Sequence, residues 1–191
     1  MQLNRCKRIN MIISLLIGYV GLDQFSKYLA KKMLVSDSII RFFGDTFRLQ
    51  YAENKGIYLS LGSSLPDEIR FWLFIVGVSI LLTFLLIFLI FFKNLPSFPT
   101  IALTLVLCGG VGNLIDRIFN QGIVIDMFNI GIGNLRTGIF NLADLAVTIG
   151  GGMMLYYLLF IEGKQHTSSP GKAEMDTAIF NDTKNDDIDE L

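Results

Sequence analysis

The feature that most constrains the fold is a long apolar stretch, residues 71–92, that contains no charged side chain. About 20 consecutive apolar residues suffice for a helix to cross the hydrocarbon core of a bilayer. Three further stretches of similar length are predominantly apolar although each carries a few polar side chains: residues 9–30, 98–119 and 140–160. The chain is 52% hydrophobic, which is more than an average soluble domain contains. The sequence therefore predicts an all-α membrane protein with four transmembrane helices.

A polar interlude, about residues 36–64, separates the first two predicted spans. Apolar and polar side chains alternate there on both sides of Gly44 and Asp45, an arrangement typical of a β-hairpin with a tight turn. Asn54 and Gly56 follow in a turn-prone setting. We predict a small extracytoplasmic β-sheet element in this interlude, carried by a four-helix membrane domain that extends over residues 1–162.

The two ends of the chain differ in charge. Residues 1–8 hold three basic side chains ahead of an apolar stretch, as a secretory signal peptide does. No small-x-small cleavage site follows, so we expect a retained first span. Lysine and arginine divide evenly between the two sides of the membrane, and the compact N-terminal cluster favours cytoplasmic termini. Residues 163–191 are polar and acidic without periodicity, which predicts a disordered tail.

Composition disfavours several kinds of chemistry. The formal net charge is −1 and no basic stripe is present, so nucleic acid is not an expected partner. Cys6 and Cys108 are far apart in sequence, and the single histidine, His166, lies in the polar tail. We therefore expect no disulfide framework, no metal site and no cofactor. Ser26 and Ser60 have no histidine partner, which argues against a serine nucleophile.

Polar and ionisable side chains gather in residues 108–144, between two apolar stretches. Such groups are costly near hydrocarbon and by default mark a functional site. Asp126 and Asp144 are expected at the edges of the connecting loop, where water reaches them. Asn113 and Asp116 are three residues apart and therefore share a helix face. Asp144 falls within the first turns of the last span, where a helix is electropositive.

The carboxylates admit more than one interpretation. If Asp126 and Asp144 face each other across a cleft, one holds a proton while the other stays charged. Such a pair hydrolyses a peptide bond by activating water and protonating the scissile carbonyl. Intramembrane aspartates also serve as proton relays in transporters, or as structural partners of Arg117 or Lys27. Asp23 and Lys27, four residues apart, pair on one helix face. The residues alone leave these alternatives open.

Five short segments resemble, in the same order, those of lipoprotein signal peptidase, the type II signal peptidase of bacteria. They are DQFSK (23–27), NKG (54–56), GGVGNLIDR (109–117), IVID (123–126) and FNLAD (140–144). The third and fifth segments, at this separation, specifically indicate this family, whereas DQFSK alone is weak evidence for it. The resemblance covers most of residues 9–160, with the four spans and the polar interlude at the expected places.

The resemblance implies a membrane aspartic endopeptidase of the bacterial cytoplasmic (inner) membrane, with its site near the extracytoplasmic leaflet. Its substrates are diacylglyceryl-prolipoproteins, cut just before the lipidated cysteine, and its other expected partners are membrane lipids and globomycin-type inhibitors. The implied catalytic dyad is Asp126 and Asp144. The implied substrate-binding residues are Asn54, Gly56, Asn113, Arg117 and Asn141, and the implied structural supports are Asp23, Lys27 and Asp116.

The chain departs from the family pattern after Gly56. The family usually continues Ala-Ala-Phe-Ser, whereas this chain has Ile57-Tyr58-Leu59-Ser60. Bulkier side chains there are expected to affect substrate preference more than chemistry.

The alternatives to a membrane endopeptidase are a non-catalytic homologue that only binds prolipoproteins and a small proton-coupled transporter. The transporter would use three aspartates as relay groups: Asp23, Asp116 and Asp144.

Overall fold

The computed structural model describes residues 4–34, 38–57 and 61–162 of the chain. Four helical segments in this part are long and apolar enough to cross a membrane: Arg5–Met33, Asp67–Phe91, Ser97–Phe119 and Leu142–Ile161. These agree with the predicted spans to within a few residues at most ends, so the predicted fold class is confirmed. The predicted tail, residues 163–191, and Tyr58, Leu59 and Ser60 of the departing segment lie outside the described residues.

Each span except the third contains a π-helical segment, which lies within the first two spans and ends the fourth. The first comprises α1 (Arg5–Leu15), Leu16–Val20 and α2 (Gly21–Met33). The second comprises α3 (Asp67–Arg70), Phe71–Gly77 and α4 (Val78–Phe91). The third is the continuous α5 (Ser97–Phe119), and the fourth is α6 (Leu142–Tyr156) followed by Tyr157–Glu162. The compact unit described below ends at Met154.

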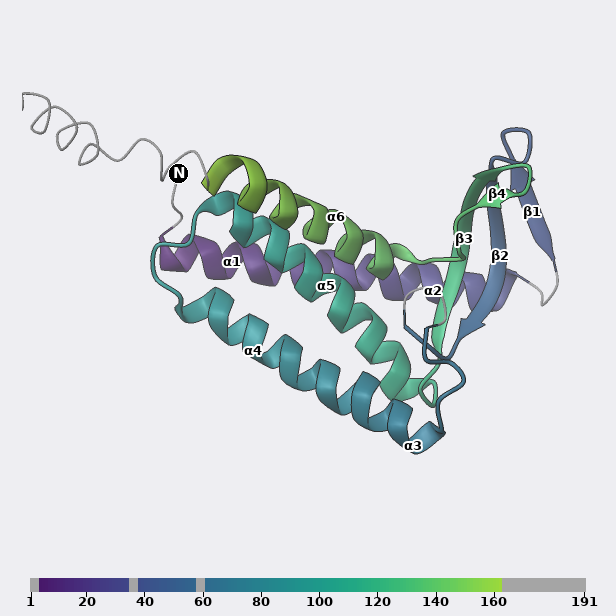
Figure 1. Cartoon of the computed structure of the whole chain (residues 1–191), viewed down its shortest axis with the longest axis horizontal. Helices are drawn as coiled ribbons and strands as arrows, with labels where there is room; N and C mark the ends of the chain where they lie inside the picture. The colour runs from purple at the N-terminus through teal and green to yellow at the C-terminus, as the bar shows by residue number, and fades with distance from the viewer. Residues whose placement is uncertain (1–3, 35–37, 58–60, 163–191) are drawn as a thin grey trace, which may run out of the picture. The chain divides into compact units, whose positions relative to one another are not determined.

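Helix α5 lies at the centre of this unit and packs against α4 and against the first span (Figure 1). Small residues on α5 allow its neighbours to approach closely. A Cβ atom at Gly109 would collide with the backbone oxygen of Ala143, and one at Gly112 would lie 2.6 Å from the Asp23 carboxylate. Glycines at such contacts are typical of helix interfaces in lipid. They bring α5, α6 and the first span together at the level of the polar residues.

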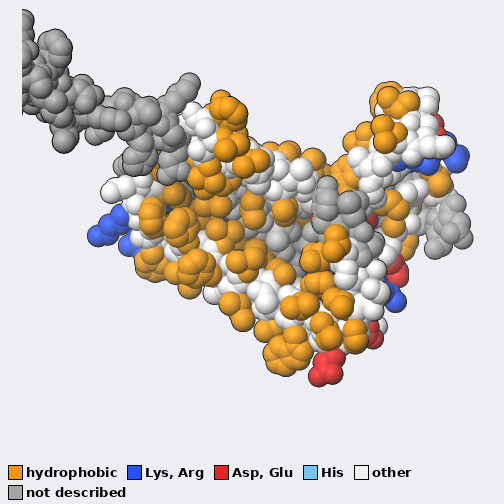
Figure 2. Space-filling model, viewed as in Figure 1, with side chains coloured by type: hydrophobic (Ala, Val, Ile, Leu, Met, Phe, Trp, Pro, Cys, Tyr) orange, Lys and Arg blue, Asp and Glu red, His pale blue; other side chains and the backbone are white. Residues whose placement is uncertain are grey.

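The outer faces of the helices are apolar. Figure 2 shows hydrophobic side chains covering the visible flank of the spans, while charged side chains gather at the two ends of the helices. Leu81 and Phe84 of α4, for example, are more than 60% exposed. A helix that is hydrophobic on all sides is a membrane span. The described part of the chain is therefore a multi-pass membrane protein.

The sheet has four antiparallel strands in sequence order: β1 (Ile39–Phe42), β2 (Phe47–Asn54), β3 (Val124–Ile132) and β4 (Leu135–Arg136). Phe42 pairs with Phe47 around a turn that includes Gly44, which confirms the predicted hairpin. Strands β3 and β4 correct the sequence prediction, which placed this segment in the loop that connects the third and fourth spans. Strand β3 contains several β-branched residues and pairs with β2, which holds Asp126 within a strand, opposite Ala52. Strand β4 pairs with the end of β3.

Candidate active site

Asp144 is held at the start of α6 by a reciprocal cap. The backbone N–H of Asp144 donates to Oδ1 of Asn141 (2.9 Å), and the backbone N–H of Asn141 donates to Oδ2 of Asp144 (3.2 Å). This is the geometry of a capping box, in which the N-cap residue and the third helical residue satisfy each other's amides. The other carboxylate oxygen, Oδ1, accepts from Nδ2 of Asn113 (2.8 Å). Both oxygens of Asp144 are thus oriented by the chain.

Asp126 lies on β3 and is 2% exposed. Its Oδ1 accepts from Nδ2 of Asn141 (2.6 Å), and its Oδ2 accepts from Nδ2 of Asn54 (3.0 Å). Burial raises the pKa of the Asp126 carboxyl to about 7, and the negative charge of Asp144 acts in the same direction. The expectation that Asp126 lies at the edge of a loop is therefore wrong, because a buried strand carries it.

Asn141 joins the two carboxylates. It is fully buried, its side-chain amide nitrogen donates to Asp126, and its backbone and side-chain oxygen hold Asp144. The same amide nitrogen lies 3.1 Å from Oδ1 of Asn113. One residue thus sets the position of both carboxylates. The dyad that the resemblance implies is assembled in one place by the fold.

A buried ion network lies beneath this pair. Nζ of Lys27 lies 2.8 Å from Oδ2 of Asp23 and 3.1 Å from Oδ2 of Asp116. It also donates to Oδ1 of Asn113 (3.0 Å), the same amide whose nitrogen donates to Asp144. All three charged residues are at most 2% exposed. The predicted pairing of Asp23 with Lys27, and the shared face of Asn113 and Asp116, are both present.

The acidic partners of Lys27 also hold backbone segments in place. Oδ1 of Asp23 accepts from the N–H of Ala143 in the first turn of α6 (2.9 Å), and Oδ2 of Asp116 accepts from the N–H of Ile125 (3.1 Å). Ile125 precedes Asp126, and Ala143 precedes Asp144. The network therefore places the backbone beside each carboxylate. Gln24, which we did not single out, donates to Asp116 (2.9 Å), although its place within DQFSK was a signal for it.

Arg117 and Gly56 contact each other. Nη2 of Arg117 donates to the carbonyl oxygen of Gly56 (2.8 Å), and Oδ1 of Asn54 accepts from the N–H of Gly56 (2.9 Å). An Asn side chain that bonds the backbone two residues ahead forms an Asx-turn. This turn aims the side-chain amide of Asn54 at Asp126. All ten residues singled out from the sequence are thus brought into one connected site.

A cavity of ≈ 170 Å³ opens beside Asp144. It is lined by Asn54, Thr137, Gly138, Ile139, Phe140, Asp144, Leu145 and Thr148. These residues come from the end of β2, the segment after β4 and the start of α6. Within the described residues, no group of three or more His, Cys, Asp or Glu side chains is placed to hold a metal ion. The arrangement is that of two carboxylates joined through Asn141, one of which, Asp144, lines a small, partly apolar cavity.

The fold is shared with solved membrane proteins. One, described as a bacterial membrane enzyme solved by the in meso method at 1.9 Å resolution, is 26% identical, has a TM-score of 0.68 and matches 80% of this chain and 95% of its own. A second, described in the same way at 2.3 Å, is 26% identical with a TM-score of 0.69, over 79% and 88% of the two chains. Fold and site together define a multi-pass membrane enzyme.

The family follows from the sequence comparisons. Residues 15–160 match the family described as "Signal peptidase (SPase) II". A lipoprotein signal peptidase of Borrelia hermsii is 36% identical over 86% of this chain and 98% of its own length. One of Borreliella burgdorferi is 35% identical over 84% and 96%. The chain belongs to the signal peptidase II family and is a protease, which confirms the resemblance seen in the five sequence segments.

Proposed function

We propose that this chain is an aspartic endopeptidase that removes the signal peptide from diacylglycerol-modified prolipoproteins, cutting before the lipidated cysteine. The observation that carries the proposal is the contact of Asp126 and Asp144 with the single residue Asn141. Membership of the signal peptidase II family supports the substrate, and relatives named lipoprotein signal peptidase support it further. Two buried carboxylates whose negative charges act on each other share one proton at neutral pH.

The proposed reaction uses that shared proton. Asp144, ionised and held by the capping box, takes a proton from water as the water oxygen attacks the scissile carbonyl carbon. Asp126 gives its proton to the carbonyl oxygen, and a tetrahedral diol forms. When the diol collapses, Asp144 passes its proton to the leaving amide nitrogen, and a diol hydroxyl returns a proton to Asp126. The pair ends in its starting state.

The remaining residues are proposed to position this pair. Asn113, Asn141 and Asn54 orient the carboxylate oxygens through the hydrogen bonds described above. Lys27 fixes the orientation of the Asn113 amide, because its ammonium group donates to Oδ1 and so leaves Nδ2 facing Asp144. Asp23 and Asp116 both pair with the ammonium group of Lys27 and hold it in place. Arg117 holds the carbonyl oxygen of Gly56, and the N–H of Gly56 in turn positions the side chain of Asn54.

The proposed location is the bacterial cytoplasmic (inner) membrane with both termini in the cytoplasm. The sheet lies at the end of the spans at which α6 begins (Figure 1). Strand β3 carries Asp126 and the first turn of α6 carries Asp144, and this topology places that end at the extracytoplasmic leaflet. Membrane lipids would then surround the helices, and a globomycin-type cyclic peptide would compete with substrate at the pair. The proposed catalytic domain is residues 1–162, and the tail, residues 163–191, is proposed to lie outside it.

A cleavage assay with a matched substrate tests the function. We expect the purified full-length protein in detergent to convert a diacylglyceryl-prolipoprotein to the mature form, and to leave the same precursor without lipid uncut. Mass spectrometry of the product locates the cut before the modified cysteine. Binding of the lipidated precursor without turnover would instead favour the non-catalytic homologue. Ion flux in proteoliposomes that depends on Asp23 and Asp116, without cleavage, would favour the transporter.

The cleavage rate is expected to fall as the pH rises through about 7. The pKa of Asp126 is raised to about 7 by burial and by Asp144, so the proton that the carbonyl oxygen needs is present below this pH and lost above it. The measurement is kcat/KM between pH 5 and pH 9, because its pH dependence reports the substrate-free protein, and the apparent value belongs to the pair. A rate that keeps rising above pH 8 would contradict the assignment.

A further inference from the structure

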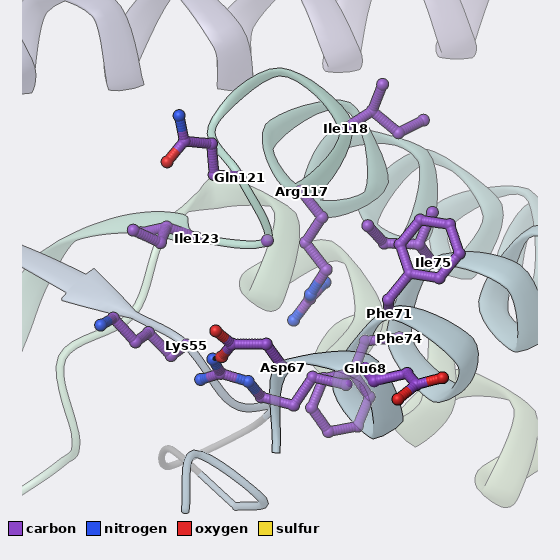
Figure 3. A pocket seen from close by; sticks show the side chains of 12 residues that line it. Lys55, Asp67, Glu68, Phe71, Phe74, Ile75, Arg117, Ile118, Gln121 and Ile123 are labelled. Atoms are coloured by element: carbon purple, nitrogen blue, oxygen red, sulfur yellow. Dashed lines mark hydrogen bonds and ion pairs between the residues drawn. The ribbon is translucent and has the colours of Figure 1, made fainter. Parts of the chain in front are cut away.

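The cavity beside Asp144 has a lining that the proposed reaction does not explain. A larger cavity, of ≈ 590 Å³, lies between the start of the second span and the end of α5, and neither Asp126 nor Asp144 lines it (Figure 3). Half of the residues that line the smaller cavity, of ≈ 170 Å³, are the consecutive residues 137–140, which connect β4 to α6. None of these four residues has a role in the proposed reaction.

Residues 137–140 run beside β3 and are bonded to it at both ends. At the first end, the N–H of Thr137 donates to the carbonyl oxygen of Ile130 (2.7 Å). At the other end, Phe140 and Phe128 exchange two backbone hydrogen bonds, each of 2.8 Å. The strand on the opposite side of β3 is β2. Residues 137–140 therefore form a short strand at an edge of the sheet, which we call the edge strand.

The edge strand contains a β-bulge. Asn129 is the single residue of β3 between the two bonded points, whereas Gly138 and Ile139 both lie between them on the edge strand. Two residues opposite one define a bulge, and bulges are frequent beside active sites. The side-chain amide of Asn129 donates to the carbonyl oxygen of Thr137 (2.6 Å). The bulge is therefore held in place from within the sheet.

The backbone groups of the bulge have no partner. In the part of the chain that the structure describes, the N–H and C=O groups of Gly138 and Ile139 form no hydrogen bond. Because both backbone groups of Phe140 bond to β3, those of Ile139 point to the outer edge. Both bulge residues are half-buried and line the cavity. Shielded backbone groups need partners, and an unpaired strand edge is a template for another strand.

The size and lining of the cavity suit a short stretch of extended peptide. Its volume is below the range of about 300–1,000 Å³ that is common for sites that enclose a whole small molecule. Phe140 and Leu145 supply apolar contacts, and Asp144 belongs to the same lining. A helical segment could not pair with the edge strand, because its N–H groups already bond within the helix. An extended peptide has these groups free.

We propose that Ile139 is the docking edge for the substrate backbone beside the scissile bond. One substrate residue adds as an antiparallel strand: its N–H donates to the carbonyl oxygen of Ile139, and its carbonyl oxygen accepts from the N–H of Ile139. Asn141, two residues further along, forms the capping box with Asp144. The pairing therefore fixes the scissile bond relative to this carboxylate. The inference rests on the proposed function for the identity of the peptide.

Backbone substitution in a substrate analogue tests this pairing without catalysis. The analogue is a lipidated precursor peptide whose scissile amide is reduced to a methylene amine, which cannot be hydrolysed. The peptide bonds that flank it are replaced by esters, one in each analogue, because an ester oxygen cannot donate a hydrogen bond. We expect binding to the full-length protein in detergent micelles to weaken about tenfold at one ester position and to stay unchanged at the next. Alternate N–H groups of a strand point to opposite edges.

Two proline substitutions provide the matched variants. Ile139→Pro deletes the N–H that would donate to the substrate, and the preceding Gly138 tolerates a following proline. Asn134→Pro makes the same change at an exposed residue of the turn between β3 and β4, outside the cavity. Ile139→Pro should bind the all-amide analogue about tenfold more weakly than the wild type, and Asn134→Pro should bind it equally well. Thermal unfolding in detergent shows whether each variant is folded.

The ester series on the wild-type protein decides the question even if Ile139→Pro does not fold. Equal binding of all the ester analogues, equal losses at successive positions, or wild-type binding by a folded Ile139→Pro would overturn the proposal. Cleavage of prolipoprotein by the wild type without the alternating pattern would reject the docking edge alone. The alternating pattern in a wild-type protein that does not cleave prolipoprotein would reject the proposed function alone.

Discussion

Replacing either Asp126 or Asp144 by asparagine is expected to lower the rate of prolipoprotein cleavage about a thousandfold or more. Each substitution removes one of the two groups that exchange protons with water and with the scissile carbonyl, and such transfers contribute about 10²–10⁴-fold each. Asparagine keeps the shape of the side chain and can accept one of the two hydrogen bonds that each carboxylate now receives. The measurement is single-turnover cleavage of a diacylglyceryl-prolipoprotein by purified full-length variants.

The effects of the two substitutions on the cleavage rate should not be additive. Because the carboxylates act as one unit, the double variant is expected to cleave about as slowly as either single variant. Asp45→Asn is the matched control, since Asp45 is a partly exposed carboxylate that pairs with Arg48 on the hairpin, and it should cleave at the wild-type rate. Substantial cleavage by Asp144→Asn would contradict the aspartic mechanism, provided that thermal unfolding shows a folded protein in each case.

The sequence predicted the local part of this site well. Asp144 was expected in the first turns of the last span, and it lies there. The structure adds that Asn141 and Asp144, three residues apart, form a capping box. The pair Asp23–Lys27 depends on residues four apart on one helix. In both cases the geometry of a single turn of helix determines the contact. Such contacts can be derived without knowledge of the tertiary fold.

The contacts between distant segments could not be derived in this way. The bond from Asn54 to Asp126 requires that β2 pair with β3 in one register, and a shift in that register occurs between Leu49 and Ala52. The apolar run of β3 is too short to distinguish a strand from a loop or a buried helical turn by periodicity. Resemblance to a family grouped these residues correctly, but only the fold shows that Asn141 joins the two carboxylates.

The same distinction applies to Arg117. Its position in GGVGNLIDR predicted a polar residue at the end of the third span, and the resemblance implied contact with substrate. The fold assigns Nη2 to Gly56, 61 residues away in the chain. Nε is buried and has no hydrogen-bond partner among the described residues. Which nitrogens of the guanidinium are paired is a property of tertiary packing, because it depends on which carbonyls the loop brings to it.

Lys27→Met is expected to have the largest effect on stability, a loss of about 3–5 kcal/mol, together with a strong loss of cleavage. The ammonium group is buried between Asp23 and Asp116, which would face each other without a counter-charge after the substitution. Those carboxylates hold the backbone beside Asp144 and Asp126, so their repulsion would disturb both catalytic positions. The measurement is thermal unfolding in detergent alongside cleavage.

A compensated variant separates the effect on stability from the effect on the site. Changing Asp23 and Asp116 to asparagine together with Lys27→Met removes all three buried charges, so much of the stability should return. Cleavage should stay low, because no ammonium group then donates to Oδ1 of Asn113 and its amide is free to rotate away from Asp144. If the triple variant regained both stability and cleavage, Lys27 would serve the fold alone. If stability returned without cleavage, Lys27 would be a positioning residue whose bond to Asn113 orients Asp144.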